Sequence, residues 1–312
     1  MNGFKNFLLS LTTTVLVGVW FATPAWADTF FFSTGTPDGR LGALSQRASF
    51  GKIETETADD FVLQQTTVIT RATITGLIPL GTPLANITQV EVELYQVFPL
   101  DSVNPPSGNV PTRVNSPADV EIDSATRDSS RRTLDFTATL ASESFTVANS
   151  VINGINKKPD QTTLGEGAKT GEEVEIRISF TTPIIVPAGH YFFRPEVLVT
   201  GGDFLYLSAP RPTVPPFAGD LQAWIRNSRL APDWLRIGTD IIGGATPPTF
   251  NMTFSLVGDT VPEAGMPGHA NCHGKTVSAL ARQFGGFSPA SVALGFPSVG
   301  ALQDEIRVFC EP

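Results

Sequence analysis

The chain has 312 residues, of which 41% are hydrophobic and 16% are charged. This composition excludes a wholly disordered protein, which combines low hydrophobicity with high charge. The net charge of −9 argues against a nucleic-acid-binding protein, because phosphate contacts need clustered Lys and Arg. Glycine and proline number 28 and 25, above their usual combined share of about 12%. A turn-rich all-β fold is therefore favoured.

The N-terminal segment has the features of a secretory signal peptide. Lys5 precedes an apolar stretch from Phe7 to Ala22, and Ala25-Trp26-Ala27 matches a small-x-small cleavage site. We expect residues 1–27 to be removed after Ala27, and the mature protein to be secreted into the periplasm or the extracellular space. The apolar run is shorter than the roughly 20 residues that a membrane-spanning helix needs. No membrane span is therefore expected after cleavage.

Residues 28–258 are predicted to form an antiparallel β sandwich of jelly-roll-like type, because strand segments of five to nine residues alternate with Pro/Gly turns. Apolar and polar positions alternate in Val90–Phe98, which predicts a half-buried strand with Glu91, Glu93 and Tyr95 on one face. Glu173–Phe180 repeats the pattern, with acid, base and hydroxyl side chains on the solvent face. Two longer loops, from Pro99 to about Asp119 and from about Pro210 to Gly219, are typical places for a binding surface.

The C-terminal part changes from strand to helix periodicity. Residues 259–268 have the composition of a linker, and residues 269–312 are predicted to form a small helical module. Apolar residues at helical spacing predict a first helix from Thr276 to Phe284, which Gly285-Gly286 would end. Ser288-Pro289 is typical of a second helix start. Ser298 can cap a third helix, Val299–Phe309.

The two cysteines, Cys272 and Cys310, both lie in this module. In an oxidising compartment, two Cys that flank a compact segment predict a disulfide. Closing a loop of about 40 residues is worth roughly 3–4 kcal/mol in the loop-entropy model. The alternative is a zinc site formed with His269 and His273, since zinc favours His and Cys ligands. The metal site requires both Cys to stay reduced, so the disulfide is preferred.

One stretch, residues 221–240, is the densest in aromatic and arginine side chains. Aromatic faces can stack on sugar rings, and Arg can bind anionic groups. The alternative hypothesis, which the pattern favours, is that the two tryptophans fill the end of the core. The candidate ligand contacts are Tyr206, Trp224, Arg226, Trp234 and Arg236.

The sequence gives little support for catalysis. His190 is interpreted as a turn residue whose ring bonds the backbone, and the chain lacks the G-x-S-x-G, H-E-x-x-H and phosphate-loop motifs. We predict no enzyme and no cofactor; a hydrolase of unknown substrate is the least favoured alternative. Acids at a strand start and at turns could bind calcium, but no calcium-loop motif supports this, and solvated or capping carboxylates are preferred. These acids are Asp59, Asp60, Asp203, Asp220, Asp233 and Asp240.

Several phrases resemble a group of uncharacterised exported bacterial β-sandwich proteins with a Cys-bracketed small helical C-terminal module. They include ADDFVL, FTVANSVINGI, VPAGHYFFRPEV, DWLRIGTDI and PTFNMTFSLVG, with NCHGKTVSALARQFGG and GFPSVGALQDEIRVFC in the tail. The resemblance covers most of the mature chain and implies the fold, export and a bacterial source. It implies no activity.

Together these features predict an exported, non-catalytic cell-envelope or extracellular protein. Its role would be structural or adhesive, through the loops and the exposed sheet face. The alternative is a carbohydrate-binding module, in a calcium-assisted form or without calcium. The predicted partner is accordingly a carbohydrate or an envelope protein, and no oligomeric state is predicted.

Overall fold

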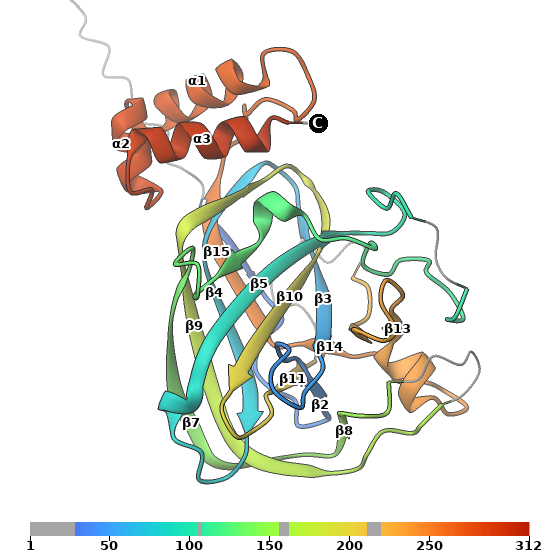
Figure 1. Cartoon of the computed structure of the whole chain (residues 1–312). Helices are drawn as coiled ribbons and strands as arrows, with labels where there is room; N and C mark the ends of the chain where they lie inside the picture. Colours follow the sequence, from blue (N-terminus) through green and yellow to red (C-terminus); the bar gives the residue numbers. More distant parts are fainter. Residues whose placement is uncertain (1–28, 105–107, 156–161, 211–219, 312) are drawn as a thin grey trace, which may run out of the picture.

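The structure is a computed structural model that describes residues 29–104, 108–155, 162–210 and 220–311. Two β-sheets form the body of the molecule, and three helices lie at one end (Figure 1). The predicted signal peptide, residues 1–27, lies outside the described residues, as does most of the second predicted loop. The strand-rich fold with a helical C-terminal region is confirmed.

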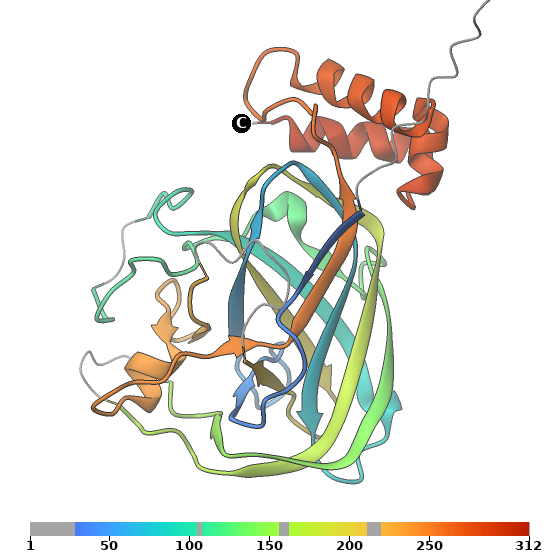
Figure 2. The same cartoon turned by 180° about the vertical axis from the view of Figure 1, so that it is seen from behind.

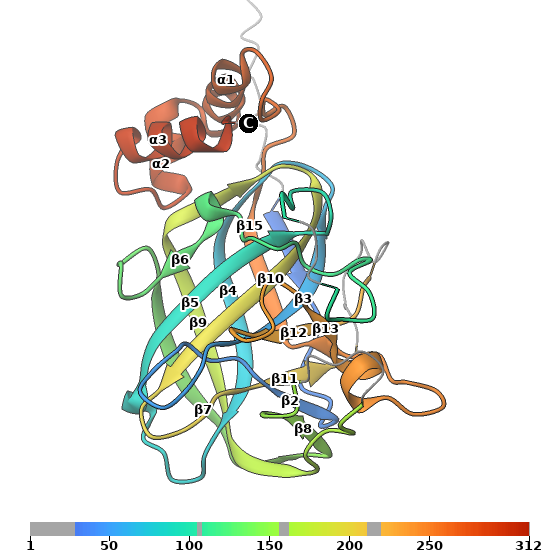
Figure 3. The same cartoon turned by 45° about the vertical axis from the view of Figure 1, so that its right-hand side comes forward.

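The first sheet has six strands, and all of its strand pairs are antiparallel. Strands β3, β10 and β5 cross the middle of this sheet side by side (Figure 3). In spatial order the strands are β13 (Leu235–Arg236), β12 (Trp224–Asn227), β3 (Thr55–Leu63), β10 (Gly189–Val199), β5 (Ile87–Gln96) and β6 (Arg127–Asp128).

The second sheet has nine strands arranged around β4 (Thr67–Ile78), which pairs with β15 (Phe254–Thr260) on one side and β9 (Lys169–Val186) on the other. Strand β1 (Thr29–Ser33) forms one edge, and β7 (Asp135–Val147) pairs with β9. The remaining strands are β2 (Leu41–Leu44), β8 (Asn149–Val151), β11 (Leu205–Ala209) and β14 (Asn251–Met252).

One pair departs from the predicted antiparallel arrangement, because β2 and β8 run parallel. Strand β8 follows β7 directly after Ala148, whose backbone N–H donates to Gly39. The chain therefore passes from β7 into β8 without a reversing turn. The second sheet is mixed rather than purely antiparallel.

The main core lies between the two sheets and includes a group of four phenylalanines. Phe61 and Phe193 come from the six-stranded sheet, and Phe32 and Phe254 come from the nine-stranded sheet. The ring centroids of Phe254 lie 5.2 Å from Phe32 and 5.0 Å from Phe193. Aromatic pairs at this spacing add about 0.5–1.5 kcal/mol each beyond their buried area. The inward-facing side chains of both sheets thus pack against one another and hold the sheets together.

Short helical turns interrupt the loops of the β region: η1 (Leu84–Asn86), η2 (Asp123–Ala125) and the π-helical η3 (Ile237–Ile242). Strand β15 ends at Thr260, within the segment predicted as linker. Three α-helices follow: α1 (Cys272–Phe284), α2 (Phe287–Ala293) and α3 (Val299–Phe309).

The helix ends agree largely with the sequence. Gly285 follows α1 with a φ of 72°, in the left-handed region that glycine adopts without strain. Helix α1 begins at Cys272, one turn before the predicted Thr276, and α2 begins at Phe287 rather than at Ser288-Pro289. Ser298 caps α3 by accepting a hydrogen bond from the Ala301 N–H over 3.0 Å.

The disulfide Cys272–Cys310 is present and joins the start of α1 to the residue after α3. The helical core extends into the sheets, because Val68 and Ile185 belong to the same apolar cluster as the helices. Val68 and Ile185 pair with each other at the start of β4 and the end of β9. Figures 1 and 2 show α1, α2 and α3 at one end of the sheets. The tail is therefore packed against the sheets.

Candidate functional site

The outer face of the six-stranded sheet carries polar and aromatic side chains in register. Glu93 lies opposite Arg194, and Arg226 lies opposite Glu56. Next to this ionic region, Tyr95 lies opposite Phe192. Because side chains alternate between the two faces of a strand, these residues all point away from the main core. They are nevertheless buried.

The ionic region, which we call the Arg194 cluster, consists of Arg47, Glu56, Glu91, Glu93, Arg194, Glu196 and Arg226. Arg194 is 2% exposed and Glu196 is 0% exposed. The Nη1 of Arg194 lies 2.7 Å from Oε2 of Glu196, and its Nη2 donates to Glu93. Arg47, in the loop between β2 and β3, contacts Glu91. The loop side chain thus closes the cluster from the outside.

The carboxyls of this cluster differ in pKa. Burial raises the pKa of Glu91 to about 8, which Arg47 and Arg194 only partly offset. Burial acts in the same direction on Glu93, but Arg194 and hydrogen bonds from Glu91 and Tyr95 hold its pKa below the usual value. Burial also raises the pKa of Glu196 well above its usual value, against the attraction of Arg194.

A split pair of carboxyl pKa values is a feature of acid–base sites. Here each such carboxyl lies against an arginine and is buried, and the cavities described below have other linings. The arrangement fits a structural ion network better than a catalytic centre. Sequence reasoning missed this cluster; the signal was charged residues at alternate positions of both β5 and β10.

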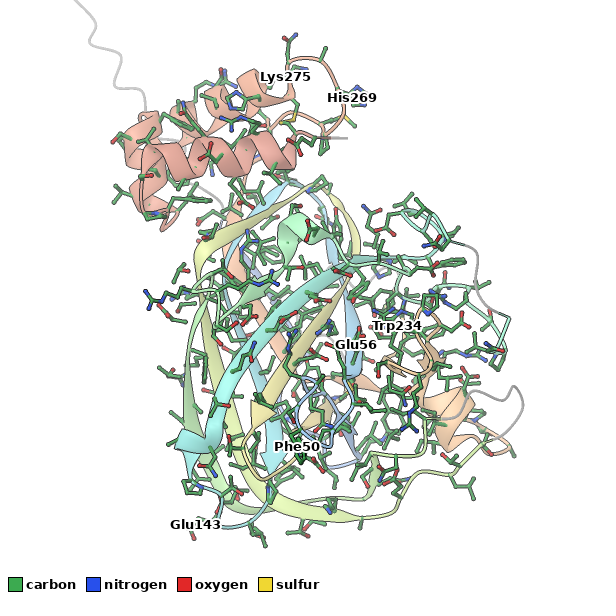
Figure 4. All side chains as sticks on the ribbon, viewed as in Figure 1. Phe50, Glu56, Glu143, Trp234, His269 and Lys275 are labelled. Atoms are coloured by element: carbon green, nitrogen blue, oxygen red, sulfur yellow. A yellow bond between two sulfur atoms is a disulfide. The ribbon has the colours of Figure 1, made fainter. Side chains whose placement is uncertain are left out.

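The predicted ligand contacts come together only in part. Trp224, Trp234 and Tyr95 pack in one apolar cluster beside the Arg194 cluster, and the two tryptophans are 1% and 0% exposed. Figure 4 shows Trp234 and Glu56 close to the same sheet. The guanidinium of Arg226 stacks 4.3 Å from the ring centroid of Trp234, whose Nε1 donates to the carbonyl of Ala118.

The segment around Ala118 therefore lies against Trp234, and because both rings are almost fully buried, neither offers a free face for a sugar. Tyr206 lies on β11 of the other sheet and is fully buried. Arg236 pairs with Asp240 over 2.6 Å. Trp224 and Arg236 do line a shared cavity of about 370 Å³, together with Asp220, Gln222 and Asn251.

The ring of His190 was predicted to hydrogen-bond the backbone, but it hydrogen-bonds a carboxylate instead. Its Nε2 lies 2.5 Å from Oδ2 of Asp60, and Oδ1 of Asp60 accepts from the Leu221 N–H over 2.8 Å. The difference arises because the register of β3 and β10 places Asp60 opposite Phe192, which makes Asp60 a diagonal neighbour of His190 on the same face. No local pattern reveals this pairing. His190 also stacks on Phe192.

The aspartates considered for calcium have local protein partners. Asp59 accepts from the Met252 N–H, Asp203 pairs with Lys52, and Asp233 pairs with Arg113. Asp220 accepts from Asn251. Within the described ranges, no group of three or more His, Cys, Asp or Glu side chains is placed to hold a metal ion. Cys272 and Cys310 are bonded to each other rather than to zinc.

The outer face of the nine-stranded sheet, by contrast, is open to solvent (Figure 2). Register aligns Arg71, Ser179 and Asp135 in one row across β4, β9 and β7, and Thr73, Arg177 and Thr137 in the next. These six residues, which we call the open face, line a shallow cavity of about 550 Å³. Five of them are exposed and Thr73 is half-buried.

Comparison with protein-family models, with curated proteins and with solved structures finds no match. Among the residues that the structure describes, no helix combines the length and the apolar character needed to cross a membrane.

Proposed function

We propose that the chain is an exported, non-catalytic protein of the cell envelope or the extracellular space, with a structural or adhesive role. The observation that carries this proposal is the open face. One sheet has its outer side covered by loops and filled by the Arg194 cluster, whereas the other presents aligned rows of polar and charged side chains to solvent. Sheet faces left bare in this way are available to a partner surface.

The finer features fit the same proposal. The two facing sheets support a jelly-roll-like β sandwich, and the three disulfide-closed helices support a tail that seals one end of it. The predicted cleavage after Ala27 and the disulfide favour an oxidising location outside the cytoplasm. The internal hydrogen bonding of His190 and the arginine pairing of the buried glutamates favour a non-catalytic role.

A charge-reversal experiment tests the adhesive role. The mature protein is mixed with isolated bacterial cell envelopes and sedimented. The face variant combines Thr73→Glu, Thr137→Glu and Arg177→Glu. A control combines Thr88→Glu, Gln303→Glu and Lys275→Glu at exposed positions elsewhere, which gives the same change in net charge.

We expect the wild-type protein and the control variant to sediment with the envelopes and the face variant to stay in solution. Equal retention of both variants would show that the open face is not the adhesive surface. A wild-type protein that stays in solution would contradict the adhesive role itself.

A further inference from the structure

A single aromatic side chain, Phe50, stands at the tip of a tight turn. The backbone N–H groups of Ser49 and Lys52 each donate to the carbonyl of the other, over 3.1 and 2.9 Å, so that Phe50 and Gly51 form the two-residue tip. Gly51 has a φ of 77°, a conformation that favours glycine. The Phe50 ring is fully exposed, and Figure 4 shows it on the outside of the lower half of the body.

The loop that carries Phe50 is fixed at several points. Gln46 and Thr55 exchange backbone hydrogen bonds of 2.8 and 3.0 Å at its base. Next to the tip, Nζ of Lys52 lies 2.6 Å from Oδ1 of Asp203 and also donates to the carbonyl of Gly202. A loop backbone fixed in this way loses little freedom when it meets a ligand, so that part of the usual ordering cost of binding is reduced.

A cleft of about 690 Å³ begins beside the turn, and Gly51, Lys52 and Ile53 line it. Its other lining residues include Gln46, Asn153, Asn227 and Arg229. Nε2 of Gln46 and Nδ2 of Asn153 already donate within the protein, and Oδ1 of Asn227 already accepts two backbone N–H groups, so a ligand would meet the second atom of each amide. Amides supply both donors and acceptors, whereas a guanidinium only donates. Arg229 makes no ion pair with another described residue. The cleft thus combines polar groups of both kinds with aliphatic lining residues such as Ile152 and Ile155.

We propose that this cleft binds an oligosaccharide that extends past Gly51 to Phe50. Phe50 is not itself a lining residue of the cleft and would serve as a stacking platform beside it, with the amides as partners of the sugar hydroxyls. A pyranose ring has an apolar C–H face for an aromatic ring and hydroxyls that both donate and accept. The surroundings of Phe50 favour this ligand over a protein or a membrane, because those partners need a wider apolar patch. The exposed apolar neighbour in the same loop, Ile53, is itself only about one-third exposed (37%).

This proposal concerns a different surface from the open face and stands whether or not the adhesive role holds. It also differs from a tryptophan-based sugar site, because Trp224 and Trp234 are covered whereas Phe50 is free. The sequence signal was a lone Phe before Gly within a polar loop, Ser49-Phe50-Gly51-Lys52.

Titration calorimetry of the mature protein with soluble oligosaccharides tests the site. The panel contains neutral gluco- and N-acetylglucosamine oligomers and, in a separate arm, uronate oligomers, which show whether Arg229 contributes. Phe50→Ala is compared with Phe31→Ala, which removes another exposed phenylalanine from β1 (46% exposed). Asn153→Ala tests the amide contribution independently of the ring.

We expect saturable binding of at least one saccharide class, weakened by about ten-fold or more in Phe50→Ala and unchanged in Phe31→Ala. Asn153→Ala should weaken the same ligand, and Phe50→Trp should retain it. The proposal is overturned if no saccharide of the panel binds or if binding does not depend on Phe50. It is equally overturned if Phe50 instead governs adsorption to phosphatidylglycerol-containing vesicles.

Discussion

Arg127 in β6 donates from Nη2 to Oε1 of Glu305 in helix α3 over 2.8 Å. The same nitrogen donates to the carbonyl of Pro183, and Arg127 is 4% exposed. A side chain of the six-stranded sheet thereby holds both the end of β9 and the helical tail. This contact couples the stability of the tail to that of the sheets.

Glu305→Ala should therefore destabilise the protein substantially. Removing one partner of a buried ion pair costs about 3–5 kcal/mol, because the remaining charge stays buried without compensation. The side chain of Glu305 keeps 13% exposure, so we expect a loss near the lower end, about 3 kcal/mol. Urea unfolding of the mature protein measures it.

The neighbouring pair Asp304–Arg307 provides the control. Its side chains are 69% and 66% exposed, and exposed pairs contribute about 0–1 kcal/mol. Asp304→Ala should leave the unfolding midpoint almost unchanged. Similar losses for the two variants would contradict the docking role of Arg127.

The disulfide should also stabilise the helical tail. Cys272 and Cys310 are separated by 38 residues, and a loop of this length corresponds to about 3–4 kcal/mol of denatured-state entropy. We expect the double variant Cys272→Ser, Cys310→Ser to expose the tail to limited proteolysis while the β region persists. The tail of the wild-type protein should become equally sensitive to protease under reducing conditions. Reductant should not change the protease sensitivity of the variant. A tail that resists protease without the disulfide would show that packing on Val68 and Ile185 suffices.

The contrast between β5 and β9 shows what the sequence can predict. Both strands alternate apolar with charged residues, and both were expected to have one solvent face. In β9 this holds, and the side chain of Arg177 is 68% exposed. In β5, Glu91 and Glu93 are buried, and they contact Arg47 and Arg194 respectively. Local periodicity predicts which side chains share a face, but the covering loops depend on long-range contacts.

The same reasoning applies to the candidate sites. The cysteine pairing needed only two cysteines and an oxidising compartment, and it was predicted correctly. The aromatic and arginine stretch did place Trp224, Arg226 and Trp234 near one another, yet inside the protein. Trp234 bonds Ala118, which lies 116 residues before it in the chain, and composition cannot reveal such a contact.

Glu91 should give the stability a distinct pH dependence. Burial raises its pKa in the folded protein to about 8, from about 4.5 for the free group. The folded state therefore holds this proton more tightly than the unfolded state does, so the contribution to stability is complete below about pH 4.5 and is lost as the pH rises toward 8. Wild-type stability should fall across this window.

Glu91→Gln removes the titrating group and should flatten that fall, as measured by urea unfolding at several pH values from about 5 to about 9. Glu175→Gln, which changes a more exposed glutamate paired with Arg177, should retain the wild-type slope. An unchanged slope in Glu91→Gln would assign the pH dependence to other buried acids such as Glu196.

The tryptophans give a direct test of the covered face. The sequence has four Trp, and two of them, Trp20 and Trp26, precede the predicted cleavage site, so Trp224 and Trp234 account for the emission of the mature protein. Both are buried, and we expect blue-shifted emission with weak quenching by iodide. Strong quenching would show that the two rings are not covered in solution.

Substituting each ring separately distinguishes their roles. Trp234→Phe removes the hydrogen bond from Nε1 to Ala118 and most of the stacking with Arg226, which should cost about 1–3 kcal/mol. Nε1 of Trp224 has no hydrogen-bond partner within the described part of the chain, so Trp224→Phe loses packing volume but no hydrogen bond. We therefore expect the larger loss of unfolding free energy for Trp234→Phe. The reverse order would mean that Trp224, rather than Trp234, ties the covering loop to the sheet.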